Sequence, residues 1–158
     1  MTVLRRIVAA GFFGALAFAV GLMATFGPAQ QILADPELQS AKFIAAFAGD
    51  PPPRMNASPY VLPIGVLVIG LAHATAFQLV YRGLPRNWFA AGLVYGLAAW
   101  LVGALWFEFY LPWNVMLEPW PLAALELACW LGVSLLTGLA IACVFRKVLR
   151  SPPQPLIM

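Results

Sequence analysis

Residues 7–26 read IVAAGFFGALAFAVGLMATF, a run of 20 residues that contains no charged side chain. A helix needs about 20 apolar residues to cross the hydrocarbon core of a bilayer, because each residue advances it by about 1.5 Å. The run therefore predicts a membrane-spanning helix. A signal peptide is the alternative, because Arg5 and Arg6 precede the run. The run is longer than the apolar part of such a peptide, and no small-x-small cleavage site follows it, so we interpret it as a retained anchor.

Three further stretches have the same character. Residues 59–81 and 88–107 carry no charge, and residues 120–145 carry only Glu126. The whole chain is 63% hydrophobic and 9% charged, whereas soluble domains carry about 25% charged residues. We predict a single all-α domain over residues 1–158. It is an integral membrane four-helix bundle of up-down-up-down topology, with spans at about 5–26, 59–81, 88–110 and 120–146.

The charged residues predict the orientation of these spans. Seven of the nine basic residues fall on one side of a four-span arrangement, namely Arg5, Arg6, Arg82, Arg86, Arg146, Lys147 and Arg150. Lys42, Arg54 and the six acids fall on or near the other side. The positive-inside rule then places both termini and the tail 147–158 in the cytoplasm of a bacterial inner membrane, and the loop 27–58 in the periplasm. Basic clusters beside apolar segments are typical of topology signals and do not indicate nucleic-acid binding.

The connections between the spans carry helix start and stop signals. Asp35-Pro36-Glu37 predicts the start of a short amphipathic periplasmic helix that runs to Ala48. The short turn 82–87 predicts that the second and third spans pack as an antiparallel hairpin. Pro112 and Pro119 are expected to stop the helices on either side of the connection 110–119.

Small residues mark where helices can approach closely. Gly92 and Gly96 form a G-x-x-x-G motif whose face continues to Gly103, and Ala128 and Gly132 form a similar face on the fourth span. Such faces favour close helix packing. The pattern does not distinguish packing within the chain from packing against another subunit.

His73 is the only histidine and lies inside the second span. With small neighbours on the same helix, it is a candidate axial ligand for a haem or a chlorophyll-type pigment, whose second ligand would have to come from a methionine or a partner subunit. The alternative is a neutral histidine that bonds to a neighbouring helix. The sequence requires no cofactor.

The acidic residues near the outer ends of the third and fourth spans are the other candidates. Glu108 and Glu126 lie close enough to those ends to approach each other, with Glu118 and Asn114 in the loop above them. Such a group could hold a cation or share a proton. The alternative is that the acids only pair with Arg54 or Lys42 at the membrane surface.

No catalytic set and no metal-binding motif accompanies these residues, so an enzyme is the less favoured class. The leading hypothesis is a non-catalytic accessory, scaffold or assembly subunit of a larger membrane complex. One alternative is a small ion, proton or solute transport component that uses Glu108 and Glu126. The other is a pigment-binding subunit centred on His73. The expected partners are membrane lipids and other membrane subunits or further copies of the chain.

Overall fold

The computed structural model describes residues 2–47 and 58–148. Every regular element in these residues is helical, and four stretches of helix are long and apolar enough to cross a membrane. These findings confirm the all-α prediction. The elements are α1 (Val3–Leu33), α2 (Ala41–Phe47), α3 (Val61–Val80), α4 (Trp88–Ala99), η1 (Trp100–Ala104), α5 (Leu105–Glu108), η2 (Phe109–Val115), α6 (Trp120–Cys143) and η3 (Val144–Val148).

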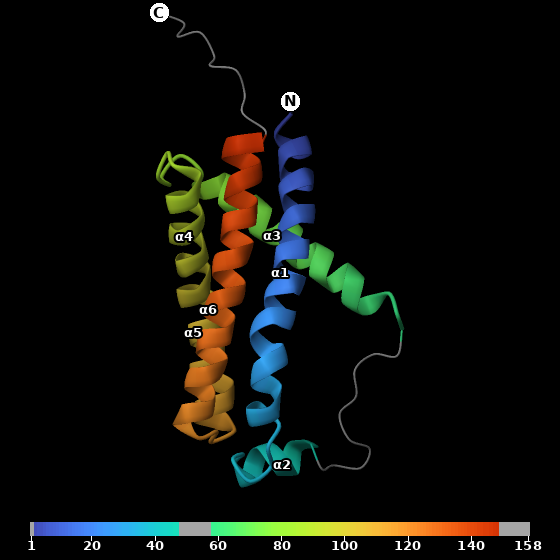
Figure 1. Ribbon diagram of the computed structural model, residues 1–158, viewed down its shortest axis with the longest axis vertical. Coiled ribbons are helices and arrows are strands. Elements are labelled where there is room, and N and C mark those ends of the chain that lie inside the picture. The colour runs from blue at the N-terminus through green and yellow to red at the C-terminus, as the bar shows by residue number, and fades with distance from the viewer. Residues whose placement is uncertain (1, 48–57, 149–158) are drawn as a thin grey trace, which may run out of the picture.

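The bundle is built around α1 and α6, which pack side by side (Figure 1). Helix α3 packs against α1, and α4 packs against α6. Helix α3 lies at a steep angle to the others, and its first half diverges from the bundle (Figure 1). The start of α1 and the end of α6 lie at one end of the bundle, whereas α2 and the turn into α6 lie at the opposite end (Figure 1).

Glycines bring the helix backbones into direct contact. A Cβ atom built on Gly138 of α6 would lie 2.5 Å from the carbonyl oxygen of Gly92 and 2.9 Å from the amide nitrogen of Gly96. A Cβ atom built on Gly132 would lie 2.8 Å from the side-chain methyl carbon of Thr25 in α1. In contrast, a Cβ atom on Gly103 would meet nothing within 4 Å. Three of the five predicted packing residues therefore lie at helix contacts, Gly103 does not, and Ala128 is exposed.

The first helix is longer than its apolar run predicts. It continues past Gly27 and Pro28 to Leu33, although an internal proline removes one backbone hydrogen bond at a cost of about 3 kcal/mol. The reason lies in tertiary packing, because Ala29 and Leu33 are buried in a cluster with Leu122 and Cys129 of α6. The helix therefore extends into residues 27–33, where the sequence predicted a loop.

The short helix between the first two long helices begins later than expected. The Asp35 carboxylate accepts a hydrogen bond from the Glu37 backbone amide, which closes a turn and does not start a helix. Helix α2 begins at Ala41, where the Ser40 hydroxyl caps the amide of Phe43. The predicted end at Ala48 lies outside the described residues.

Helices α3 and α4 do not pack along their length as the predicted hairpin would. They meet through side chains, where Tyr95 contacts His73 and the buried ring of Phe77. At that end, the Arg146 guanidinium donates hydrogen bonds to the carbonyl oxygens of Tyr81 and Leu84, and so ties α6 to the turn between α3 and α4.

Candidate functional site

Three glutamates converge at the end of the bundle that carries α2. Glu108 is the last residue of α5, Glu118 lies in the turn before α6, and Glu126 lies on α6. One carboxylate oxygen from each lies within 4.8 Å of the others. Glu108 and Glu118 are each only 2% exposed. We refer to these three residues as the carboxylate cluster.

A widened helical turn explains how Glu108 reaches the α6 side. In η1 the Leu105 amide bonds to the Trp100 carbonyl, five residues back, so one extra residue is accommodated. In a regular α-helix, at about 100° per residue, Glu108 would lie about 120° from the Gly96 face that contacts α6. One extra residue reduces this angle to about 20° and rotates Gly103 away from α6.

A second irregular segment places Glu118. The helix does not stop before Pro112 as expected but continues to Val115 as the widened segment η2, whose turns leave room for the proline ring. The chain then reverses at Leu117, which has a φ of 56°, a left-handed conformation that costs a non-glycine residue about 1–2 kcal/mol. The Glu118 amide donates to the Pro112 carbonyl at 2.9 Å and thereby closes the turn.

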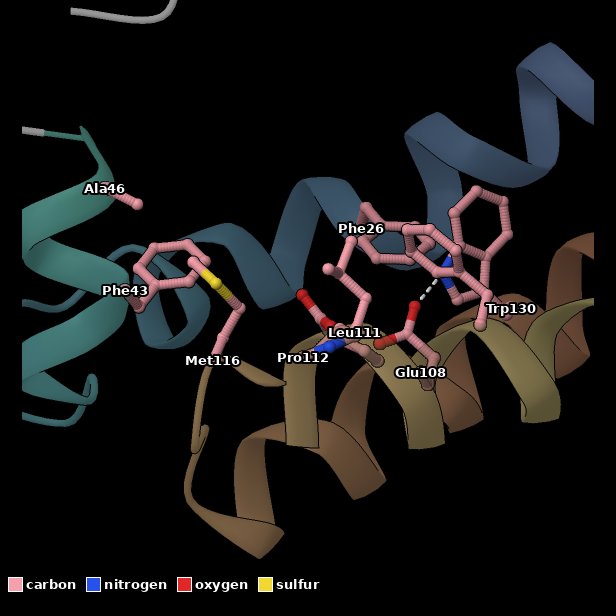
Figure 2. Close-up of a pocket in the computed structure, with 10 residues that line it drawn as sticks. Phe26, Phe43, Ala46, Glu108, Leu111, Pro112, Met116 and Trp130 are labelled. Atoms are coloured by element: carbon pink, nitrogen blue, oxygen red, sulfur yellow. Dashed lines mark hydrogen bonds between the residues drawn. The ribbon is translucent and has the colours of Figure 1, made fainter. Parts of the chain in front are cut away.

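Neutral donors orient two of the three carboxylates. The Trp130 indole Nε1 donates to Glu108 Oε1 at 2.8 Å (Figure 2). The Gln39 amide Nε2 donates to Glu118 Oε1 at 3.4 Å and to the Leu33 carbonyl at 2.7 Å. The second oxygens of Glu108 and Glu118, together with Gln39 Oε1, are buried without a hydrogen-bond partner. Two carboxylate oxygens of the cluster and the amide oxygen of the adjacent Gln39 thus lack a donor.

A pocket of about 430 Å³ opens beside Glu108 and Glu126. Its walls come from α1, α2, the α5–η2 segment and α6, and Figure 2 shows Phe43 and Ala46 of α2 at the opposite side of the pocket from Trp130. Helix α2 is held there by the Ser40 hydroxyl, which donates to the Met116 carbonyl at 2.6 Å. The cluster is therefore reached through a mainly apolar pocket that α2 partly covers.

The charges of the cluster are not balanced by the described residues. Lys42, one expected partner, donates instead to the Val115 carbonyl, and Arg54, the other, lies outside the described residues. Two unit charges 4.8 Å apart repel by about 3.5 kcal/mol at an effective dielectric constant of about 20. Full ionisation of all three acids would therefore cost about 10 kcal/mol. Burial first, and then the nearby Glu126 carboxylate, raise the pKa of Glu118, whereas the Gln39 hydrogen bond lowers it.

The remaining polar candidates lie apart from the cluster. Asn114 is exposed. Further along α6, the buried Thr137 hydroxyl donates to the Val133 carbonyl of its own helix. Trp130 shares a helix face with Glu126, and this spacing is a usable sequence signal. Gln39 was not foreseen, because nothing in its local sequence relates it to residues almost 80 positions away.

His73 forms a hydrogen-bonded pair with Tyr95 of the neighbouring helix. The Tyr95 hydroxyl donates to the His73 carbonyl oxygen at 2.8 Å, and its oxygen lies 3.0 Å from His73 Nδ1. Because the hydroxyl proton is already used, Nδ1 is the donor in this contact, and only Nε2 remains for a ligand. The observed contact is the helix-bonding role that was the alternative to pigment binding.

No protein-family model, curated protein or solved structure matches this chain.

Proposed function

We propose that this chain is an accessory component of a bacterial inner-membrane assembly and that it holds a proton or a cation at the carboxylate cluster. In this proposal its four spans alternate in direction, both termini are cytoplasmic, and α2 lies on the periplasmic surface. The cluster then lies just inside the outer face of the membrane. Six basic residues of the described part of the chain belong to the segments at the opposite end and support this orientation, namely Arg5, Arg6, Arg82, Arg86, Arg146 and Lys147.

The observation that carries the proposal is the convergence of three acids, two of them almost fully buried. A repulsion of about 10 kcal/mol is as large as the whole stability of a typical domain, about 5–15 kcal/mol. The folded chain therefore favours states in which a proton or a cation reduces this charge. A group whose charge state depends on a bound ion is suited to ion or proton handling.

The rest of the bundle supports an accessory role over independent transport. Beyond the cluster the core contains Phe77, Ile141 and Phe145, each at most 1% exposed. Such apolar packing offers no route for an ion through the described part of this chain. A complete pathway would therefore need a second chain, either a different subunit or another copy.

Two measurements test this proposal. In proteoliposomes that contain the copurified assembly, Glu126→Gln should abolish proton or cation flux, whereas Glu37→Gln, which changes an exposed acid near the same end, should leave the flux unchanged. Purification in mild detergent should recover partner subunits or a defined oligomer. A monodisperse single chain, together with unchanged flux in Glu126→Gln, would refute the proposal.

The orientation has its own test. Arg82→Cys should react with an impermeant thiol reagent only from the cytoplasmic side, and Glu37→Cys only from the periplasmic side. Both positions are exposed in the structure. Labelling of position 82 from the periplasm would reverse the topology and place the cluster at the cytoplasmic face.

A further inference from the structure

We infer that the carboxylate cluster is a binding site for one divalent cation of the size of Ca²⁺, taken from the outer side of the membrane. This inference deepens the proposed function and rests on it, because the same three acids are used. It adds the class of ion and the residues that bind it.

The spacing of the acid oxygens matches one ion. Oxygen ligands lie about 2.3–2.6 Å from Ca²⁺, so two ligands on opposite sides of the ion are about 5 Å apart. The three carboxylate oxygens lie within 4.8 Å of one another, which is compatible with one such ion among them. Mg²⁺ demands near-ideal octahedral geometry and usually keeps several water ligands, whereas Ca²⁺ accepts more protein oxygens in a flexible arrangement. Three converging carboxylates therefore favour the larger ion.

The second and independent observation is the set of unpartnered buried oxygens. Glu108 Oε2 and Glu118 Oε2 are buried without a donor, and both side chains are 98% removed from solvent because each is 2% exposed. Gln39 Oε1, on the residue that bonds to Glu118, is a third such atom. Buried acceptors of this kind require an explanation. One cation among the carboxylates would satisfy the free oxygens of Glu108 and Glu118.

The donor set also indicates a hard ion. Carboxylate and amide oxygens favour Ca²⁺, Mn²⁺ and Mg²⁺, whereas zinc and copper sites draw on imidazole or thiolate. The only histidine is occupied with Tyr95 on another part of the bundle, and the nearest thiol, Cys129, donates to the Thr25 carbonyl. Water in the adjoining pocket of about 430 Å³ can complete the coordination.

The surrounding side chains hold the ligands in position. Trp130 fixes the rotation of the Glu108 carboxylate, and Gln39 contacts Glu118. Neutral donors on the outer side of ligating carboxylates are the usual second layer of a metal site. Because Gln39 and Ser40 both precede α2, an ion bound here would also fasten α2 over the pocket.

The experiment uses the full chain in mild detergent, first freed of metal with a chelator. Mn²⁺ serves as the probe, since its electron paramagnetic resonance signal decreases on binding, and Ca²⁺ is added as the competitor. We expect one Mn²⁺ per chain, displaced by Ca²⁺ more effectively than by Mg²⁺. Glu108→Gln and Glu126→Gln should each weaken binding about tenfold or more, whereas Glu37→Gln should not change it.

The outcomes separate this inference from the proposed function. Absence of stoichiometric Mn²⁺ and Ca²⁺ binding to the parent chain overturns the inference, and needs no variant that might fail to fold. If flux in Glu126→Gln is nevertheless lost, the proposed function stands with a proton as its ion. If Glu37→Gln weakens Mn²⁺ binding as much as the cluster variants do, the inference is also overturned, because the ion then binds to exposed acids and not to the carboxylate cluster. Stoichiometric binding with unchanged flux supports the cation site and shows that flux through the assembly does not depend on it.

Discussion

Replacement of Gly138 tests whether direct backbone contact holds α4 against α6. A Cβ atom at this position would lie 2.5 Å from the Gly92 carbonyl oxygen and 2.9 Å from the Gly96 amide nitrogen. Favourable contacts of carbon atoms lie at about 3.5–4.0 Å, so the helices would have to separate by about 1 Å. Both nearby atoms belong to the backbone, and no change of rotamer can move them.

The matched control is Gly103, where a new side chain meets open space. Gly138→Leu and Gly103→Leu gain the same helix propensity, about 1 kcal/mol, so their difference isolates the packing. Overpacking costs about 1–3 kcal/mol, and we expect the upper end because the interface cannot relax locally. At about 2–4 °C per kcal/mol for a chain of this size, Gly138→Leu should melt about 6–12 °C below Gly103→Leu.

The measurement is the loss of the helical circular dichroism signal on heating in mild detergent, with unfolding by sodium dodecyl sulphate as an independent second scale. Both variants are compared as monodisperse samples of the same oligomeric state, because a change in assembly would alter the melting temperature by itself. Equal melting temperatures would refute the close approach of α4 and α6 and the rotation of Gly103 away from it.

Three further changes test other contacts in the same unfolding assay. Burial raises the pKa of Glu118 above its ordinary value of 4.5. In metal-free protein, the stability that Glu118 contributes is therefore complete below pH 4.5 and is lost as the pH rises through the folded pKa. Glu118→Gln should flatten this decline of stability with pH. Arg146→Gln leaves two carbonyl oxygens without a charged donor and should cost about 1.5–3 kcal/mol, whereas Arg82→Gln, at an exposed position, should stay within about 0.5 kcal/mol. Tyr95→Phe removes both contacts with His73 and should cost about 1–3 kcal/mol.

The long helices were predictable because their cause is local. A charge-free apolar run has few structural solutions other than a helix, so composition alone located all four candidate spans. The ends were less predictable, because they depend on distant residues. Pro28 is a helix-stop signal in the sequence, yet α1 continues through it since Leu33 packs against Leu122 of α6. Rules that consider only neighbouring residues in the sequence cannot predict that contact.

The sequence also predicted that the acids lie near one another, but it did not predict how their side chains are oriented. Counting residues from the helix ends places Glu108 and Glu126 at similar depth, and this needs only the rise per residue. Glu108 faces α6 because of the widened turn η1. No residue in Trp100–Ala104 predicts this turn from the sequence. The same turn explains why Gly103, on the expected packing face in a regular helix, meets nothing.

Two of the three widened helical segments in the described residues, η1 and η2, lie next to the carboxylate cluster. Widened turns flank Glu108 on both sides, and the left-handed residue Leu117 immediately precedes Glu118. Strain of this kind persists where the surrounding structure enforces it, and it gathers at functional sites. Apolar side chains would fill the same space without repulsion and without unpartnered oxygens. Stability alone therefore gives no reason for three acids here, whereas the proposed ion would, because it would convert their repulsion into attraction to a common centre.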